Sequence, residues 1–246
     1  MSPAHNLAAS PPPAAEAVTT LCPPASTIPV RPPLPLRLAP ASQFAWEDLT
    51  QAYNQTRIDY IVPMPMNVAR LREYVHTYDV ELEASAVAME TDRIVGLAML
   101  GVRPRRAWIT RLGVLPATRQ RHVGQALMEH LIEQAAARGS EYILLEVIRG
   151  NEPAYRLFEK LGFVELRELL ILRRPPGKAP PPPPYTAQTL NHQCALDALR
   201  CYRGVPSWLT ETRSLENAGN LAGIQVELAD GGRGWIVYQN TVFQLK

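Results

Sequence analysis

The alternation of apolar and polar residues predicts a strand followed by a helix in the middle of the chain. Between residues 108 and 114 the larger apolar side chains recur at every second position, which is typical of a strand, and Pro116 ends it. From Val123 to Ala135 the apolar residues recur every three to four positions, which indicates a helix that Gly139 terminates. A short basic loop joins the two elements.

The same patterns divide residues 36–172 into further elements. The order is β-α-α-β-β-β-α-β-α-β, which predicts an α/β (α+β) domain with a mixed, mostly antiparallel sheet flanked by helices. The predicted strands cover residues 35–39, 85–90, 94–102, 108–114, 142–147 and 163–172, and the predicted helices cover residues 44–56, 67–75, 124–138 and 153–161.

Proline-rich segments frame this predicted domain of residues 36–174. Residues 1–35 are rich in proline and alanine and cannot bury enough surface to fold, so we expect them to be disordered. Residues 175–187 contain an unbroken proline run and are expected to form a semi-rigid linker. We expect residues 1–35 and 175–187 to lack a packed core.

Residues 188–246 form a predicted small C-terminal α+β extension. Helices are expected at residues 190–202 and 206–215, and a hairpin is expected around Asp230, Gly231 and Gly232. Because so short a piece is marginally stable alone, we expect it to pack on the main domain or to mediate self-association. The order helix, helix, hairpin also matches residues 44–102. An alternative interpretation of the extension is therefore a degenerate, partial second unit of the same kind.

Composition and charge limit the classes of partner. The chain has 246 residues, 46% of them hydrophobic and 20% charged, and a formal net charge of +2. Neither nucleic acid nor a membrane surface is indicated by this charge, and no apolar stretch is long enough to span a bilayer. Three cysteines without metal-type spacing and the lack of a signal-peptide pattern lead us to expect a cytoplasmic protein without a bound metal.

The basic loop before the central helix has the chemistry of an anion site. The first turn of a helix has backbone N–H groups without partners and the positive end of the helix dipole, and Arg119 and Arg121 add charges beside it. We therefore expect a phosphate group to bind there.

Residues 119–124, Arg-Gln-Arg-His-Val-Gly, resemble the Arg/Gln-x-x-Gly-x-Gly/Ala signature of the GNAT acetyltransferase superfamily, whose loop holds the pyrophosphate of acetyl-CoA. His122 stands where the signature has its first glycine, unless the register is Arg121-x-x-Gly124-x-Ala126. The resemblance implies acetyl-CoA as co-substrate. It implies these cofactor-binding residues: Arg119, Gln120, Arg121, His122, Val123, Gly124, Gln125 and Ala126.

A second block, residues 145–163, resembles the Leu-Glu-Val strand, the Asn-x-x-Ala helix and the Leu-Gly-Phe ending of the same superfamily, most closely in ribosomal-protein-alanine acetyltransferases. By this resemblance Glu146 is the candidate general base, with a salt-bridged surface glutamate as the alternative. Asn151 binds the cofactor arm, or else caps the helix ahead of Pro153. The backbone of Leu112, Gly113 and Val114 holds the thioester and pantetheine.

The predicted helix 153–161 departs from the superfamily at one position. Many members carry a tyrosine there, which protonates the departing sulfur of CoA. Phe158 stands there, within the expected cofactor site, and Tyr155 lies one turn earlier, where it is the candidate catalytic hydroxyl or else a packed surface side chain.

The implied activity is transfer of an acetyl group to a primary amine by direct attack in a ternary complex. The alternatives are a non-catalytic acyl-CoA sensor and an interaction protein that uses its proline segments. In the superfamily the first two helices line the acceptor site, but their mixed charges do not identify the amine, and the oligomeric state is open.

Overall fold

The computed structural model describes residues 36–171, 177–178, 186–228 and 230–239. All of them belong to one compact unit, residues 34–246. The disorder predicted for residues 1–35 and most of the predicted linker lie outside the described residues. The end of the main domain at residue 174 and the start of the extension at residue 188 stay predictions.

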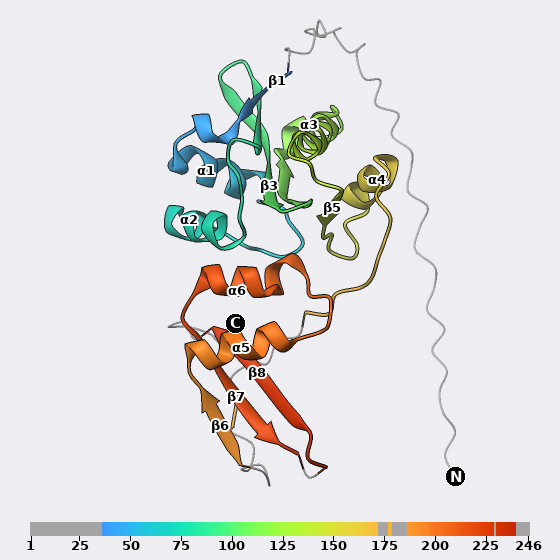
Figure 1. Ribbon diagram of the computed structural model, residues 1–246. Coiled ribbons are helices and arrows are strands. Elements are labelled where there is room, and N and C mark those ends of the chain that lie inside the picture. Colours follow the sequence, from blue (N-terminus) through green and yellow to red (C-terminus); the bar gives the residue numbers. More distant parts are fainter. Residues whose placement is uncertain (1–35, 172–176, 179–185, 229, 240–246) are drawn as a thin grey trace, which may run out of the picture. The chain divides into compact units, whose positions relative to one another are not determined.

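A five-stranded sheet in the order β1-β2-β3-β4-β5 forms the centre of the fold (Figure 1). The first four strands pair antiparallel, and β5 joins β4 in parallel. β3 is the middle strand and is buried along most of its length on both faces, which explains its nearly continuous apolar sequence. The strands are β1 (Leu36–Pro40), β2 (Ala86–Glu90), β3 (Arg93–Arg103), β4 (Arg106–Val114) and β5 (Tyr142–Leu145).

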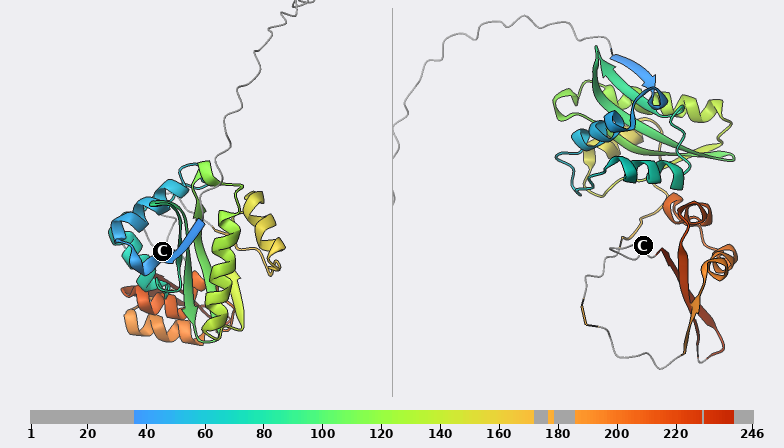
Figure 2. Two further views of the ribbon diagram at one scale, coloured as in Figure 1. Left: turned by 90° about the horizontal axis from the view of Figure 1, so that it is seen from above. Right: turned by 90° about the vertical axis from the view of Figure 1, so that its left-hand side faces the viewer.

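Helices cover both faces of this sheet, as predicted. Figure 2 shows α1 (Trp46–Thr56) and α2 (Val68–Thr77) on one face and α3 (Val123–Ala137) on the other. α4 (Glu152–Lys160) lies on the α3 side, where Phe158 joins the core. Two short 3-10 turns, Ala41–Gln43 and Pro116–Thr118, complete the domain. The mixed α/β fold expected from the sequence is confirmed.

Local chemistry explains where two of these helices begin. The side chain of Asn67 accepts a hydrogen bond from the backbone N–H of Arg70 at 2.9 Å, so it caps α2. Pro153 lies in the first turn of α4, where its missing N–H costs nothing.

The strand predicted at residues 163–172 is wrong within the described residues, which extend to 171. The sheet ends at β5, and the apolar side chains of this segment, such as Val164 and Ile171, are largely exposed. Arg167 donates hydrogen bonds to the backbone carbonyls of Val205 and Pro206, which hold the segment beside the C-terminal extension instead of along β5.

The C-terminal extension contains a three-stranded antiparallel sheet and two helices. The hairpin and the first of the two helices predicted for the extension are confirmed. The second predicted helix is divided into a 3-10 turn, Trp208–Thr210, and α6 (Thr212–Ala218). The short strand β6 (Ala187–Leu190) was not predicted because it has four residues and directly follows the prolines. The other elements are α5 (His192–Cys201), β7 (Leu221–Glu227) and β8 (Arg233–Gln239).

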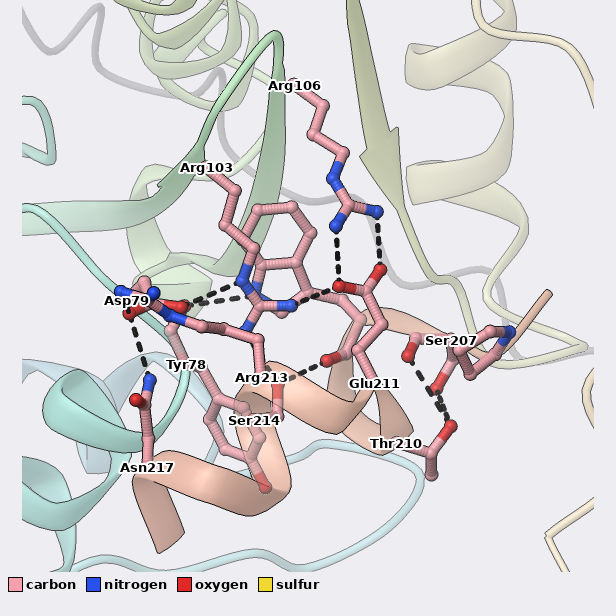
Figure 3. A network of polar contacts seen from close by, with 12 residues as sticks. Tyr78, Asp79, Arg103, Arg106, Ser207, Thr210, Glu211, Arg213, Ser214 and Asn217 are labelled. Carbon is pink, nitrogen blue, oxygen red and sulfur yellow. Dashed lines mark hydrogen bonds and ion pairs between the residues drawn. The ribbon is translucent and has the colours of Figure 1, made fainter. Parts of the chain in front are cut away.

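The extension packs on the main domain, one of the two outcomes expected. Glu211 receives hydrogen bonds from Arg103 and Arg106 of the β3–β4 hairpin (Figure 3). Asn217 of α6 donates to Asp79, which also pairs with Arg103. Because the side chain of Arg103 is only 3% exposed, these carboxylates compensate a charge that the core encloses.

Among the helices in the described ranges, none has both the length and the apolar character that crossing a bilayer requires.

Candidate active site

A bulge in β4 lies just beyond the point where its pairing with β5 ends. Leu97 and Met99 of β3 pair with Gly113 and Thr110, so one residue of β3 faces two residues of β4, Arg111 and Leu112. Arg111 has a φ of +55°, which turns the strand away from its previous course. The parallel pairing of β4 with β5 accordingly ends at Ile109 and Leu145. The two strands do not pair beyond this point.

The edge of β4 that faces this opening is built from Leu112 and Val114. Leu115 donates its N–H to Val95 of β3, so by alternation Gly113 faces β3 and its two neighbours face away. The carbonyl of Leu112 accepts a hydrogen bond from Arg57 at 3.2 Å, and that of Val114 accepts one from Arg119 at 3.2 Å. Arginine side chains thus bond to both carbonyls of this edge, outside the sheet ladder.

Gly113 lets the C-terminus of α1 approach the bulge. A Cβ atom at this position would lie 2.3 Å from Oγ1 of Thr56, far below van der Waals contact. Thr56 also accepts a hydrogen bond from Arg119 through its backbone carbonyl. The glycine thus brings α1, β4 and the basic loop together.

The basic loop winds into the start of α3 through two left-handed residues. Gln120 has a φ of +61° and His122 a φ of +60°, a conformation that glycine adopts without strain. This accounts for the glycine that the superfamily has at position 122. His122 occupies the N-cap of α3, but its side chain forms no capping bond within the described part of the chain.

The first turn of α3 keeps its positive end open to a ligand. Val123 is buried, Gly124 lies in ordinary contact distance of Leu157 and Val114, and Ala126 donates to the carbonyl of His122. Gln125 turns outward, where its carbonyl accepts from Lys160 at 2.8 Å. The geometry agrees with an anion site at the helix N-terminus.

Both arginines of the loop form ion pairs. Arg119 contacts Asp59 through two nitrogens at 2.6 and 2.7 Å, and Arg121 contacts Glu90 at 2.8 Å. These hydrogen bonds to Arg119 hold the pKa of the Asp59 carboxyl below its usual value. The arginines are partly exposed and lie beside the helix start, so a phosphate would compete with these carboxylates for them.

Glu146 lies one residue beyond β5, outside the strand that was predicted to extend to residue 147. The strand is shorter because β4 turns away at its bulge and no longer pairs with β5. The surrounding protein reduces hydration of the carboxyl group and raises its pKa, although Arg167 and Arg111 act in the opposite direction. Tyr78 lies within electrostatic range of the same carboxylate.

The three candidate residues at α4 lie in different surroundings. Asn151 is the N-cap residue, yet its side chain forms no capping bond among the described residues, so it stays available to a ligand. Phe158 is buried and packs edge-to-face against Phe163. Tyr155 is exposed, and the nearby acidic side chains, Glu159 foremost, raise its pKa, so its hydroxyl keeps its proton.

Sequence reasoning missed a cluster of arginine and tyrosine side chains between α1, α2 and β4. Arg111 lies over the ring of Tyr74 at 4.1 Å and donates to the hydroxyl of Tyr53 at 3.1 Å. Arg57, which follows α1, lies 4.8 Å from the centre of the Tyr53 ring. No motif in the sequence indicated this cluster, because its members are brought together by the β4 bulge and the end of α1.

Comparison with known proteins finds a match over most of the main domain. Residues 44–163 match the family model described as the acetyltransferase (GNAT) family. The [ribosomal protein bS18]-alanine N-acetyltransferase of Salmonella typhimurium is 36% identical over 74 residues, which are 30% of this chain and 50% of the relative. The enzyme of the same name from Escherichia coli K12 is 33% identical over 76 residues, 31% of this chain and 51% of the relative.

The chain thus spans about half the length of the curated relatives it matches. Among solved structures, the ribosomal-protein-S18-alanine N-acetyltransferase of Escherichia coli aligns over 54% of this chain and 79% of its own, with 20% identity and a TM-score of 0.45.

Proposed function

We propose that the chain is an N-acetyltransferase, because its residues 44–163 match the model of the acetyltransferase (GNAT) family. It transfers the acetyl group of acetyl-CoA to a primary amine, such as a peptide N-terminus, a lysine or a small-molecule amine. The transfer occurs by direct attack in a ternary complex, without a covalent enzyme intermediate. A cytoplasmic location stays part of this proposal.

The end of the pairing between β4 and β5, next to the open N-terminus of α3, carries the proposal. In this arrangement the helix end and the residues from Arg119 to Ala126 bind the pyrophosphate. The edge at Leu112 and Val114 supplies hydrogen bonds to the pantetheine arm, and the amide of Asn151 supplies another. Gly113 allows the end of α1 to lie close to this edge, and the buried Phe158 anchors α4 to the core.

Glu146 is the proposed general base. An alkyl amine titrates near about 10.4 and an α-amine near about 7.7–8.0, so the acceptor must lose a proton before or during attack. Loss of hydration raises the pKa of Glu146, which brings its basicity closer to that of the amine. The proton passes to the carboxylate directly or through one water.

The departing CoA sulfur needs little help from the protein. Phe158 carries no hydroxyl, and the exposed Tyr155 is the nearest candidate on the same helix. A thiol with a pKa near about 8.5 can leave as the thiolate. A general acid usually raises the rate by a factor of about 10² to 10⁴, and we expect its absence here to lower the rate by a factor near the low end of this range.

The buried Phe158 also favours a second candidate, an acyl-CoA sensor that binds without turnover. Thiol release from acetyl-CoA separates the two functions. We expect release that depends on an added amine or peptide, measured with a panel of acceptors. Tight CoA binding without such release would instead support the sensor.

Variants of the loop test the cofactor site itself. Replacing Arg119 and Arg121 with Ala together with Gly124→Val should weaken CoA binding strongly in calorimetry, because it removes two charges and crowds the helix start. The pair Arg105→Ala and Arg138→Ala is the matched control, since both arginines form exposed ion pairs elsewhere. Unchanged affinity in the loop variant would overturn the assignment.

Asp59 provides a further control for Arg119. Asp59→Asn releases Arg119 from its ion pair but leaves the positive charge in place. CoA affinity should be retained or increased in this variant, whereas Arg119→Ala alone should decrease it. Equal losses in both variants would mean that the ion pair only supports the loop.

A further inference from the structure

Two partly buried guanidinium groups meet at the acceptor side of β4. Arg57 and Arg111 lie 4.8 and 5.3 Å from the centre of the same Tyr53 ring. Arg57 bonds to the carbonyl of Leu112, the residue next to Arg111. Two like charges therefore share one aromatic wall beside the open edge of the sheet.

Neither guanidinium forms an ion pair with a carboxylate in the described ranges. The Nε atoms of Arg57 and Arg111 are buried and have no hydrogen-bond partner there. Burial lowers the pKa of Arg57, and the neighbouring charge of Arg111 lowers it further, although Tyr53 acts in the opposite direction. A positive charge in such surroundings is costly unless an anion compensates it.

Three other arginines of the main domain are paired with carboxylates. Arg103 contacts Asp79 and Glu211, Arg119 contacts Asp59, and Arg121 contacts Glu90. In each of these three cases a carboxylate compensates the arginine charge. Arg57 and Arg111 differ from this pattern at the place where the acceptor of the proposed reaction must enter.

Aromatic rings stabilise the two charges without neutralising them. Arg57 also lies over Tyr60 at 4.9 Å, and Arg111 lies over Tyr74 at 4.1 Å. The hydroxyl of Tyr74 is fixed by Thr110 at 2.6 Å, so the wall around Arg111 is rigid. The left-handed backbone of Arg111 directs its side chain to this wall, and such strain is usual at binding sites.

We propose that Arg57 and Arg111 form an anion-binding subsite, and that the acceptor is a small amine carrying a carboxylate or phosphate group. This inference rests on the proposed function. Guanidinium groups bind both kinds of anion with two parallel hydrogen bonds. The anion binds at the arginines, and the amine is thereby directed toward the β4 edge, with Glu146 within electrostatic range of Arg111.

Matched acceptors test the subsite. Thiol release from acetyl-CoA is measured with amino acids, with the corresponding amino acid amides, and with an amino sugar with and without a phosphate group. We expect kcat/KM to be at least tenfold higher for one anionic series than for its neutral analogue. The series that responds identifies the carboxylate or the phosphate as the recognised group.

Arg57→Gln and Arg111→Gln should abolish this preference, because kcat/KM should fall at least tenfold further for the anionic acceptors than for their neutral analogues. Arg111→Lys should restore part of the preference because it keeps the charge. Arg105→Gln is the control, since this arginine is exposed and pairs with Glu141. Equal losses for anionic and neutral acceptors would overturn the subsite and leave the proposed acetyltransferase function intact.

A binding measurement keeps the inference testable if no acceptor is turned over. Thermal denaturation is followed with succinate, phosphate or neutral succinamide at matched ionic strength, in the wild type and in the two Gln variants. Either anion should raise the Tm of the wild type by several degrees more than that of the variants, which keep the phosphate site proposed at the start of α3. No difference between wild type and variants would refute the subsite whether or not the chain is an enzyme.

Discussion

Trp208 of the C-terminal extension stacks on Trp108 of β4, with ring centres 5.8 Å apart and planes inclined by 15°. Trp208 is 1% exposed and donates its indole N–H to the carbonyl of Tyr78. Trp108 in turn packs against Tyr74 and Tyr78. The extension therefore supports the aromatic wall on which Arg111 lies, and its role is more than the covering of a surface.

Trp208→Ala should destabilise the chain by about 3–5 kcal/mol, the usual cost of removing a buried tryptophan. The cavity would lie in the core between α1, α2 and the sheet, where Trp208 contacts main-domain residues. Urea denaturation measures the change, and Ile236→Ala is the control because this side chain of the same extension is largely exposed. Equal effects of the two variants would mean that the extension contributes no packing to the main domain.

Glu211→Ala should also destabilise strongly because it leaves Arg103 and Arg106 without their shared carboxylate. Removing one partner of a buried ion pair costs about 3–5 kcal/mol, and the loss should fall toward the low end since Arg103 keeps Asp79. Glu216→Ala breaks an exposed pair with Arg200 and should cost no more than about 1 kcal/mol. Chemical denaturation of both variants tests the difference.

Sequence patterns predicted most of the main domain, because β3, β4 and α3 have strong and regular apolar periodicity. These patterns correctly placed the start of α3 at Val123 and the end of β4 before Pro116. Patterns failed at residues 163–171, which were expected to complete the sheet as its last strand. An apolar-rich segment shows only that a strand could form, and pairing depends on contacts elsewhere, here those of Arg167.

The candidate site was predicted only as far as a motif names its residues. The basic loop and Glu146 stand in blocks that resemble the family, and their roles stay predictions. Arg57 and Arg111 are 54 positions apart in the sequence, and only the β4 bulge brings them to one ring. The contact between Trp108 and Trp208 is likewise invisible in the sequence, because it depends on how the extension folds back.

Gly113→Ala should disturb the junction of α1 with the bulge. The added methyl group would overlap Oγ1 and Cβ of Thr56, at 2.3 and 2.8 Å, and overpacking of this kind costs about 1–3 kcal/mol. Thr56→Gly removes both atoms, so the double variant should lose less stability than the two single losses added together. Additive losses, measured by urea denaturation, would exclude a direct clash.

His122→Gly should stabilise the chain and preserve CoA binding. The left-handed backbone costs a non-glycine residue roughly 1–2 kcal/mol, while the greater freedom of glycine in the unfolded chain takes back about 0.4–1 kcal/mol. No capping bond is lost within the described residues. His130→Gly in the middle of α3 is the control of opposite sign, because glycine there costs about 1 kcal/mol. A destabilised His122→Gly variant would show that the imidazole itself supports the loop.

Glu146→Gln should remove the acidic limb of the pH–rate profile and lower turnover by about 10² to 10⁴. The pKa of Glu146 is raised by loss of hydration, so its base form, and with it the rate, should appear at higher pH than for an ordinary glutamate.

The same shift in the pKa of Glu146 has a consequence for stability. A carboxyl whose folded pKa is raised favours folding while protonated and loses this contribution as pH rises through the folded pKa. At neutral pH the wild type therefore bears a small destabilisation that Glu146→Gln should relieve. Denaturation midpoints and steady-state rates, measured for the wild type and for Glu146→Gln, test both the expected loss of rate and the expected gain of stability. A variant that is slower and not less stable at neutral pH has lost a base, whereas one that is slower and less stable has lost a structural ion pair.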